Sequence, residues 1–206
     1  MLNRTFTPFI LLFAFLGGCA PGAAPSVRHS SKFPSSIALL PLSSEAIDVR
    51  APELVRSLFD TYLSAANFNL ADIKGTDQKL EGLGISEGGQ LNAFPPKKLA
   101  ETLGVDALLY GDIEEFNNAN IGVYAKRAVK VRLWLVDPET GATIWESERS
   151  KANAQLGLSK EAAKDILVSG YAGKAVENIM NNPLRPEAED AVRLLVRDLG
   201  KARRDW

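Results

Sequence analysis

Apolar and polar residues alternate most regularly over residues 121–136, and this period of two predicts a long β-strand with one buried face. A turn at 137–141 follows, and residues 142–150 return as an antiparallel partner. The asparagines within 117–120 predict a further turn, placed before the long strand. The pattern therefore predicts a long antiparallel hairpin. Its apolar face carries Val123, Ala125, Val129, Val131, Leu133 and Leu135.

Other apolar runs show no alternation, which is typical of strands covered on both faces. Residues 34–42 predict a buried first strand closed by a proline, and residues 105–113 predict a central strand. A short second strand is predicted over residues 67–70. Such strands need helices on both sides of the sheet, so the α/β class is favoured.

Four segments carry helix signals. Pro52 begins a stripe of apolar residues at helical spacing that ends near Ala66. Pro95 and Pro96 begin a helix that Gly104 stops. Two helices are predicted at the C-terminal end, over 159–179 and 186–200.

Residues 71–94 are punctuated by glycines, and only 76–81 suggest a short helix there. A glycine-rich loop can cradle phosphate, but this one follows no clear strand and carries Glu87 where an anion would sit. We interpret it as a surface loop bordering a cleft.

Composition narrows the chemistry. The 206 residues contain 24 basic and 25 acidic side chains, which disfavours bulk nucleic-acid binding. The single histidine, His29, lies in a flexible stretch, so a Ser-His-Asp triad is a poor fit. With one histidine and one cysteine, a structural zinc site lacks ligands. We expect no metal, no cofactor and no enzymatic activity.

The N-terminal segment predicts a signal peptide. Arg4 supplies positive charge, and the apolar run 9–16 is too short to cross a bilayer. The run ends in Leu16, Gly17, Gly18 and Cys19, the only cysteine in the chain.

This ending resembles the lipobox of bacterial lipoproteins. The resemblance implies that Leu16, Gly17 and Gly18 are read by the signal peptidase and that Cys19 carries diacylglycerol and an N-acyl chain. We therefore expect a signal peptide at 1–18, a lipidated flexible tether at 19–33 and one α/β periplasmic domain at 34–206. Ala20, rather than an aspartate, favours the outer membrane.

Two surfaces are candidate sites. The polar face of the long strand groups cations with aromatic residues and could bind an acidic partner or glycan. We favour the simpler interpretation that these charges pair with Glu146 and Glu148 across the hairpin. Asp112, Glu114 and Glu115 are the densest acidic cluster, but Glu114 and Glu115 should point to opposite faces of a strand. The candidate interaction face consists of Tyr124, Lys126, Lys130, Arg132 and Trp134.

Three segments together resemble a known group. Residues 37–42 are similar to its opening strand, 99–111 to its helix–strand signature, and 131–146 to its hairpin. The group is the CsgG-like and ABC-transport-auxiliary-like lipoprotein superfamily, and within it a branch of unknown function typified by a meningococcal surface antigen. The resemblance implies a three-layer αβα sandwich with a mixed sheet. It also implies an accessory role beside an envelope partner, which in this group is often a CsgG-like lipoprotein.

Three functions therefore remain open. The first is a lipid-anchored scaffold or accessory subunit of an envelope assembly or secretion complex, which acts by protein–protein interaction. The second is a periplasmic module that binds a small molecule or glycan beside residues 71–94. The third is a carboxylate-dependent hydrolase that uses Asp112, Glu114 and Glu115.

Overall fold

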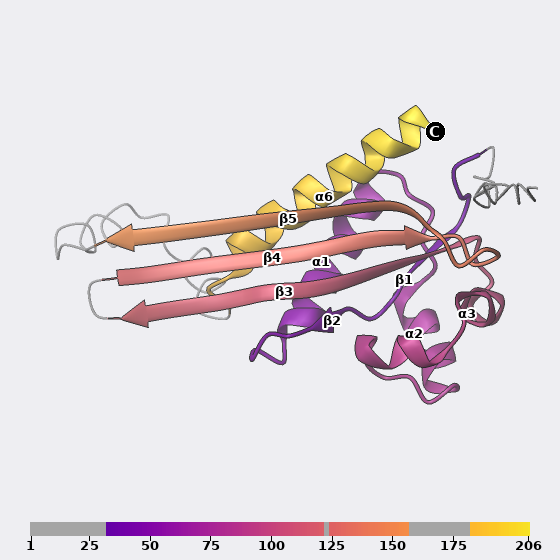
Figure 1. Cartoon of the computed structure of the whole chain (residues 1–206), viewed down its shortest axis with the longest axis horizontal. Coiled ribbons are helices and arrows are strands. Elements are labelled where there is room, and N and C mark those ends of the chain that lie inside the picture. The colour runs from indigo at the N-terminus through magenta and orange to yellow at the C-terminus, as the bar shows by residue number, and fades with distance from the viewer. Residues whose placement is uncertain (1–31, 122–123, 157–181) are drawn as a thin grey trace, which may run out of the picture.

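The computed structural model describes residues 32–121, 124–156 and 182–206 (Figure 1). Its centre is a five-stranded mixed sheet in the order β1-β3-β4-β5, with β2 also paired to β3. The short strands β1 (Ile37–Leu39) and β2 (Ser43–Ser44) run parallel to β3 (Ala107–Ile121). The strands β4 (Tyr124–Val136) and β5 (Thr143–Leu156) continue the sheet in antiparallel order. The predicted long hairpin is thus confirmed as the β4–β5 pair.

One face of the sheet is covered by α1 (Ala51–Ala65) and α6 (Arg185–Asp205). Both helices begin with a proline in the first turn, where the missing N–H costs no hydrogen bond. Their apolar stripes meet the odd-numbered residues of β4 and form the main core. The fully buried members of this core include Val55, Phe59, Leu63, Val131, Leu133, Leu135, Leu195 and Leu199.

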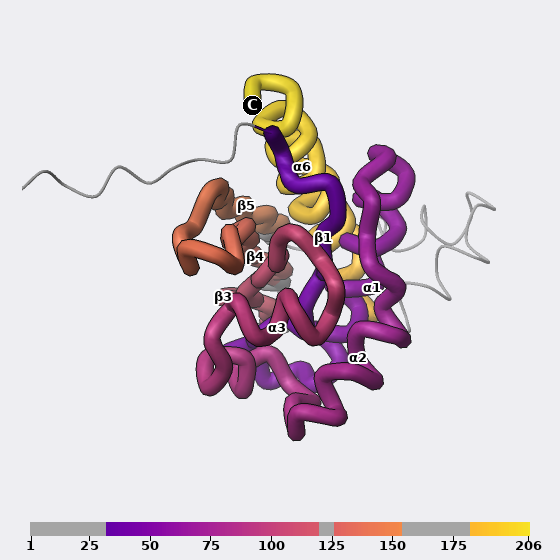
Figure 2. The backbone as a smooth tube through the Cα atoms, turned by 90° about the vertical axis from the view of Figure 1, so that its right-hand side faces the viewer, coloured from indigo at the N-terminus to yellow at the C-terminus, as the bar shows by residue number. Residues whose placement is uncertain are grey.

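The opposite face is covered near β1 by α2 (Ile73–Glu81), the 3-10 helix η1 (Gly88–Ala93) and α3 (Pro96–Leu103). Figure 2 shows α2 beside α3 in this layer and α1 beside α6 in the other. The strand β1 separates the two layers. Ile37 and Leu39 join the main core, whereas Ala38 and Leu40 join a second core under α2 and α3. The predicted three-layer αβα arrangement is therefore confirmed.

Several local predictions were wrong. Asn117 and Asn118 form no turn, because they pair with Ala128 and Arg127 within β3 and β4. Ladder pairing over the whole hairpin outweighs the turn preference of asparagine. The predicted strand at 67–70 is reduced to one bridge between Leu70 and Ile37.

Other predictions lie outside the described residues. They are the signal peptide, the recognition residues Leu16, Gly17 and Gly18, the lipidation site Cys19, and the helix at 159–179. The tether at 19–33 is described only at its last two residues. There, Phe33 contacts the rings of Phe68 and Trp206, with ring centres 6.1 and 5.5 Å apart.

Candidate functional site

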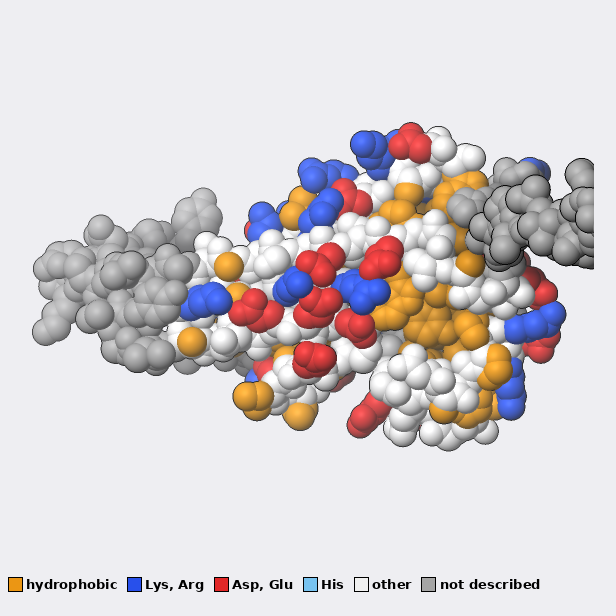
Figure 3. Space-filling view, viewed as in Figure 1, with side chains coloured by type: hydrophobic (Ala, Val, Ile, Leu, Met, Phe, Trp, Pro, Cys, Tyr) orange, Lys and Arg blue, Asp and Glu red, His pale blue; other side chains and the backbone are white. Residues whose placement is uncertain are grey.

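The predicted interaction face lies on the side of β3, β4 and β5 that faces away from α1 and α6; we call it the outer sheet face. Figure 3 shows charged side chains of both signs along it, with apolar side chains gathered next to them toward α2 and α3. Lys126, Lys130, Arg132 and Trp134 all lie there and are partly exposed, as the alternation predicted. The fifth predicted residue, Tyr124, belongs to β4, but its side chain is outside the described part.

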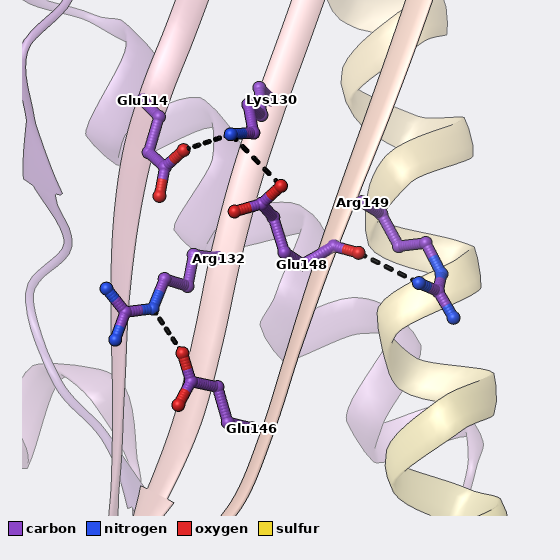
Figure 4. A network of polar contacts seen from close by, with 6 residues as sticks. All are labelled: Glu114, Lys130, Arg132, Glu146, Glu148 and Arg149. Atoms are coloured by element: carbon purple, nitrogen blue, oxygen red, sulfur yellow. Dashed lines mark hydrogen bonds and ion pairs between the residues drawn. The ribbon is translucent and has the colours of Figure 1, made fainter.

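Two cations of the outer sheet face, Lys130 and Arg132, are paired with carboxylates (Figure 4). The Lys130 ammonium lies 2.6 Å from Glu114 Oε2 and 3.0 Å from Glu148 Oε1. The Arg132 Nε lies 2.5 Å from Glu146 Oε1. The hydrogen bonds that Lys130 and Arg132 donate to these carboxylates raise the pKa of both cations. The predicted pairing with Glu146 and Glu148 is confirmed.

The long strand contributes only cations to the outer sheet face, but the face as a whole is not cationic. Among the described residues it carries three cations and five carboxylates, because β3 contributes acids to the same side. A face of this kind offers an acidic partner little net attraction. Its role as an interaction surface stays a prediction. The charged residues are Asp112, Glu114, Glu115, Lys126, Lys130, Arg132, Glu146 and Glu148.

A β-bulge corrects the prediction for Glu114 and Glu115. The register shifts between Ile113 and Glu115, so Glu114 is an extra residue in the strand. As a result both glutamates lie on the outer sheet face, and Glu115 lies 3.4 Å from the Lys126 ammonium. Asp112 accepts a hydrogen bond from the Ser43 hydroxyl. The three carboxylates proposed for a hydrolase are therefore each engaged by a neighbouring side chain.

Aromatic rings join the outer sheet face to the second core. Tyr110 and Trp134 stack nearly parallel, with ring centres 5.7 Å apart at 9°. The Arg132 guanidinium lies 5.0 Å above the Trp134 ring. Burial raises the pKa of Tyr110 to about 12, because the phenolate cannot be solvated there.

This pKa predicts a loss of stability at alkaline pH. The unfolded chain releases the Tyr110 proton near pH 10, whereas the folded chain holds it until about 12. Ionisation therefore favours unfolding as pH rises through this window. We expect Tyr110→Phe to show a smaller drop in Tm than the wild type between pH 9 and 11, measured by circular dichroism. An equal drop in both proteins would contradict the buried phenol.

The described residues also form a cavity of about 690 Å³ beside α1. Its walls are the segment from β1 to α1, the first half of α1, part of α2, and residues 86–89. On one wall, the Arg56 guanidinium lies 2.7 Å from Asp77 Oδ1 and donates to the Leu39 carbonyl at 2.9 Å. Only 11% of the Arg56 side chain is exposed. This half-buried pair ties α1 to both α2 and β1 next to the cavity.

The cavity borders residues 71–94, where the sequence predicted a cleft. That stretch is more ordered than expected, since it contains α2 and η1. Gly88 lies tightly against the chain: a β-carbon there would be 2.3 Å from the Ser43 amide nitrogen. The other walls of the cavity were not predicted. Ile47 and Val49, two apolar residues in the polar segment between the first strand and the first helix, were the available signal.

The described residues contain no group of three or more histidine, cysteine, aspartate or glutamate side chains arranged to hold a metal. In the same part of the chain, no helix has both the length and the apolar character needed to span a bilayer. His29 lies outside the described residues.

Comparisons with known proteins extend these observations. The sequence profile of the family described as "Putative lipoprotein GNA1162-like" matches residues 26–199. "Putative lipoprotein NMB1124/NMB1162" of Neisseria meningitidis serogroup B is 25% identical over 138 residues. That match covers 66% of this chain and 64% of the relative, slightly less than two thirds of the relative's length.

Two solved structures are also similar. The crystal structure of lipoprotein GNA1162 from Neisseria meningitidis has a TM-score of 0.55 at 24% identity. It covers 72% of this chain and 100% of that chain, and it supports the αβα fold. The PelC dodecamer from Paraburkholderia phytofirmans has a TM-score of 0.47 at 14% identity, covering 79% of this chain and 86% of that one.

Proposed function

The chain belongs to the GNA1162-like lipoprotein family, and from this premise we propose that it is a lipid-anchored accessory protein of the bacterial cell envelope. Cys19 is the anchor in this proposal, and the folded body acts by binding other proteins. Diacylglycerol and an N-acyl chain together hold a protein stably on a membrane, whereas one chain gives marginal binding. The body would face the periplasm from the outer membrane.

The tether sets how far the body reaches. In this proposal residues 19–33, which contain proline, glycine and serine, act as a flexible linker with an r.m.s. span of about 20 Å. Phe33 packs on the body, which places the end of the linker beside Phe68 and Trp206. In this proposal the domain begins there and extends to residue 206, and it can bind partners close to the membrane surface.

One observation carries the interaction role. Ile47 and Val49 are 99% and 89% exposed beside a cavity of about 690 Å³, while the large apolar residues of both cores are buried. Exposed apolar side chains that adjoin a cavity are typical of a surface that another molecule covers. A surface of this kind suits an accessory protein that binds a partner protein.

The proposal is tested by purifying the full-length lipoprotein from membranes in mild detergent. We expect one or more envelope proteins to copurify in stoichiometric amounts with the wild-type protein. The Cys19→Ser variant, produced at the same level, should recover less of each partner because it is no longer concentrated at the membrane. Recovery of the wild-type protein alone, at the mass of a monomer, would contradict the accessory role.

A second function is favoured by the volume of the cavity. Sites for small molecules commonly enclose about 300–1,000 Å³, and this cavity falls within that range. If it binds a cell-wall fragment, soluble muropeptides should raise the Tm of the protein in proportion to the logarithm of their concentration. An unchanged Tm at millimolar muropeptide would exclude this alternative.

A further inference from the structure

The loop between β2 and α1 exposes two β-branched side chains to water. Ile47 and Val49 lie on this loop, which projects from the body (Figure 1), and Val49 also lines the cavity. We call these two residues the apolar rim. Both are aliphatic, so covering them with another apolar surface is favourable.

The cavity beside the apolar rim has an excess of negative charge. Its walls carry Asp48, Glu53, Asp77 and Glu87 against a single cation, Arg56. Asp77 neutralises Arg56, and Asp48 lies 3.6 Å from the Arg50 guanidinium. The excess therefore falls on Glu53, in the first turn of α1, and on Glu87, just before η1. Both glutamates are exposed and line the cavity from different segments, so both contribute to its negative potential.

We propose that the cavity and the apolar rim bind an extended segment of a partner protein, in which a lysine or arginine lies next to apolar residues. The basic side chain enters between Glu53 and Glu87, and the apolar residues cover Ile47 and Val49. This inference rests on the proposed accessory function and names the surface and the chemistry of the partner.

The geometry favours a polypeptide over a small molecule. A compound confined to the cavity would leave Ile47 uncovered, because this side chain is almost entirely exposed and is not among the lining residues. A chain that crosses the rim and enters the cavity covers both.

The charge also argues against a membrane as the occupant. Glu45, Asp48 and Glu53 flank the apolar rim and would be repelled by anionic headgroups. The rim also lacks tryptophan and tyrosine, which anchor proteins at the bilayer interface.

Site-specific photocrosslinking in intact cells tests the proposal with the full-length lipoprotein. A photoreactive amino acid replaces Ile47 or Val49, and a control replaces Glu101, which is exposed on α3. We expect a discrete protein adduct at 47 and 49 and none at 101. Mass spectrometry of the adduct should identify a partner segment with a lysine or arginine within a few residues of the crosslink.

Charge reversal provides the second arm. The double change Glu53→Lys and Glu87→Lys should lower the yield of the adduct at position 47 by at least about tenfold, the usual effect of disrupting an interaction hot spot. The matched control is Glu81→Lys with Glu101→Lys, at exposed sites on α2 and α3. It changes the net charge of the protein by the same amount and should leave the yield of the adduct unchanged. Equal Tm values for the two double variants exclude a folding defect as the cause of a lower yield.

Three results would overturn the docking site: adducts with lipid only, a crosslinked segment without a basic residue, or a yield that both doubles leave unchanged. Copurification separates this failure from failure of the proposed function. If Ile47→Ser with Val49→Ser retains the wild-type partners, the docking site is wrong and the accessory role stands. If the wild-type protein recovers no partner, the accessory role itself fails.

Discussion

Gly88→Ala is expected to destabilise the protein by about 3 kcal/mol, the upper end of the usual cost of overpacking. The new β-carbon would lie 2.3 Å from the Ser43 amide nitrogen and 2.4 Å from the Leu42 carbonyl carbon. Both are backbone atoms, so no side-chain rotation can relieve the clash. The η1 helix must then move away from the β1–β2 segment, which exposes Leu42 and Leu91, each 3% exposed in the native fold. For a domain of this size the change lowers Tm by about 6–12 °C.

The adjacent glycine provides a matched control. A β-carbon on Gly89 has no heavy atom within 4 Å, and the residue is exposed. We expect Gly89→Ala to change the free energy of unfolding by less than about 0.5 kcal/mol, as is usual for surface substitutions. Urea denaturation of both variants measures the difference. Equal stability of the Gly88→Ala variant and the wild type would show that η1 does not pack against the β1–β2 segment.

Cys19→Ser is expected to move nearly all of the protein from the membrane fraction to the periplasmic fraction. A serine hydroxyl cannot form the thioether that carries diacylglycerol, and Cys19 is the only thiol in the chain. Each buried methylene contributes about 0.8 kcal/mol, so loss of the acyl chains removes far more binding energy than surface contacts provide. Cell fractionation after a high-salt wash, followed by immunoblotting, measures the change.

Ala20→Ser is the control for this experiment, because it alters the neighbouring residue and keeps the thiol. This variant should remain in the membrane fraction. If the Cys19→Ser protein stayed there as well, some other part of the chain would have to hold it to the membrane.

Local signals were sufficient for most of the elements. The prolines at the start of α1 and α3 and the glycine after α3 mark boundaries that the backbone enforces, and Gly104 has a φ of +76°. The alternation over residues 129–135 of β4 correctly identified its buried and partly exposed faces, since side chains alternate in any regular strand. The apolar character of β1 on both faces predicted the two covering layers.

Features set by tertiary contacts were not predictable from local patterns. A bulge at Glu114 shifts the register of β3, and no nearby residue signals it. For this reason the glutamates of β3 were expected on opposite faces of the strand. The turn preference of the asparagines in β3 led to a predicted turn at 117–120, which ended the strand too early. Pairing with β4 extends β3 to Ile121.

The cavity illustrates a related limit. Its walls come from segments between residues 41 and 89, and only the folded chain brings them together. The glycine-rich stretch correctly predicted one wall of the cavity. The apolar rim at Ile47 and Val49 could be recognised only from the exposure of these side chains in the folded protein. The exposure of a side chain depends on the whole fold, so the hydropathy pattern alone does not predict it.

The mass of the native protein, purified from membranes and measured intact, tests the central claim most directly. We expect a chain that begins at Cys19 and carries a diacylglyceryl thioether with an amide-linked fatty acid. A free thiol on a chain that still contains residues 1–18 would contradict the lipid anchor and the envelope role built on it.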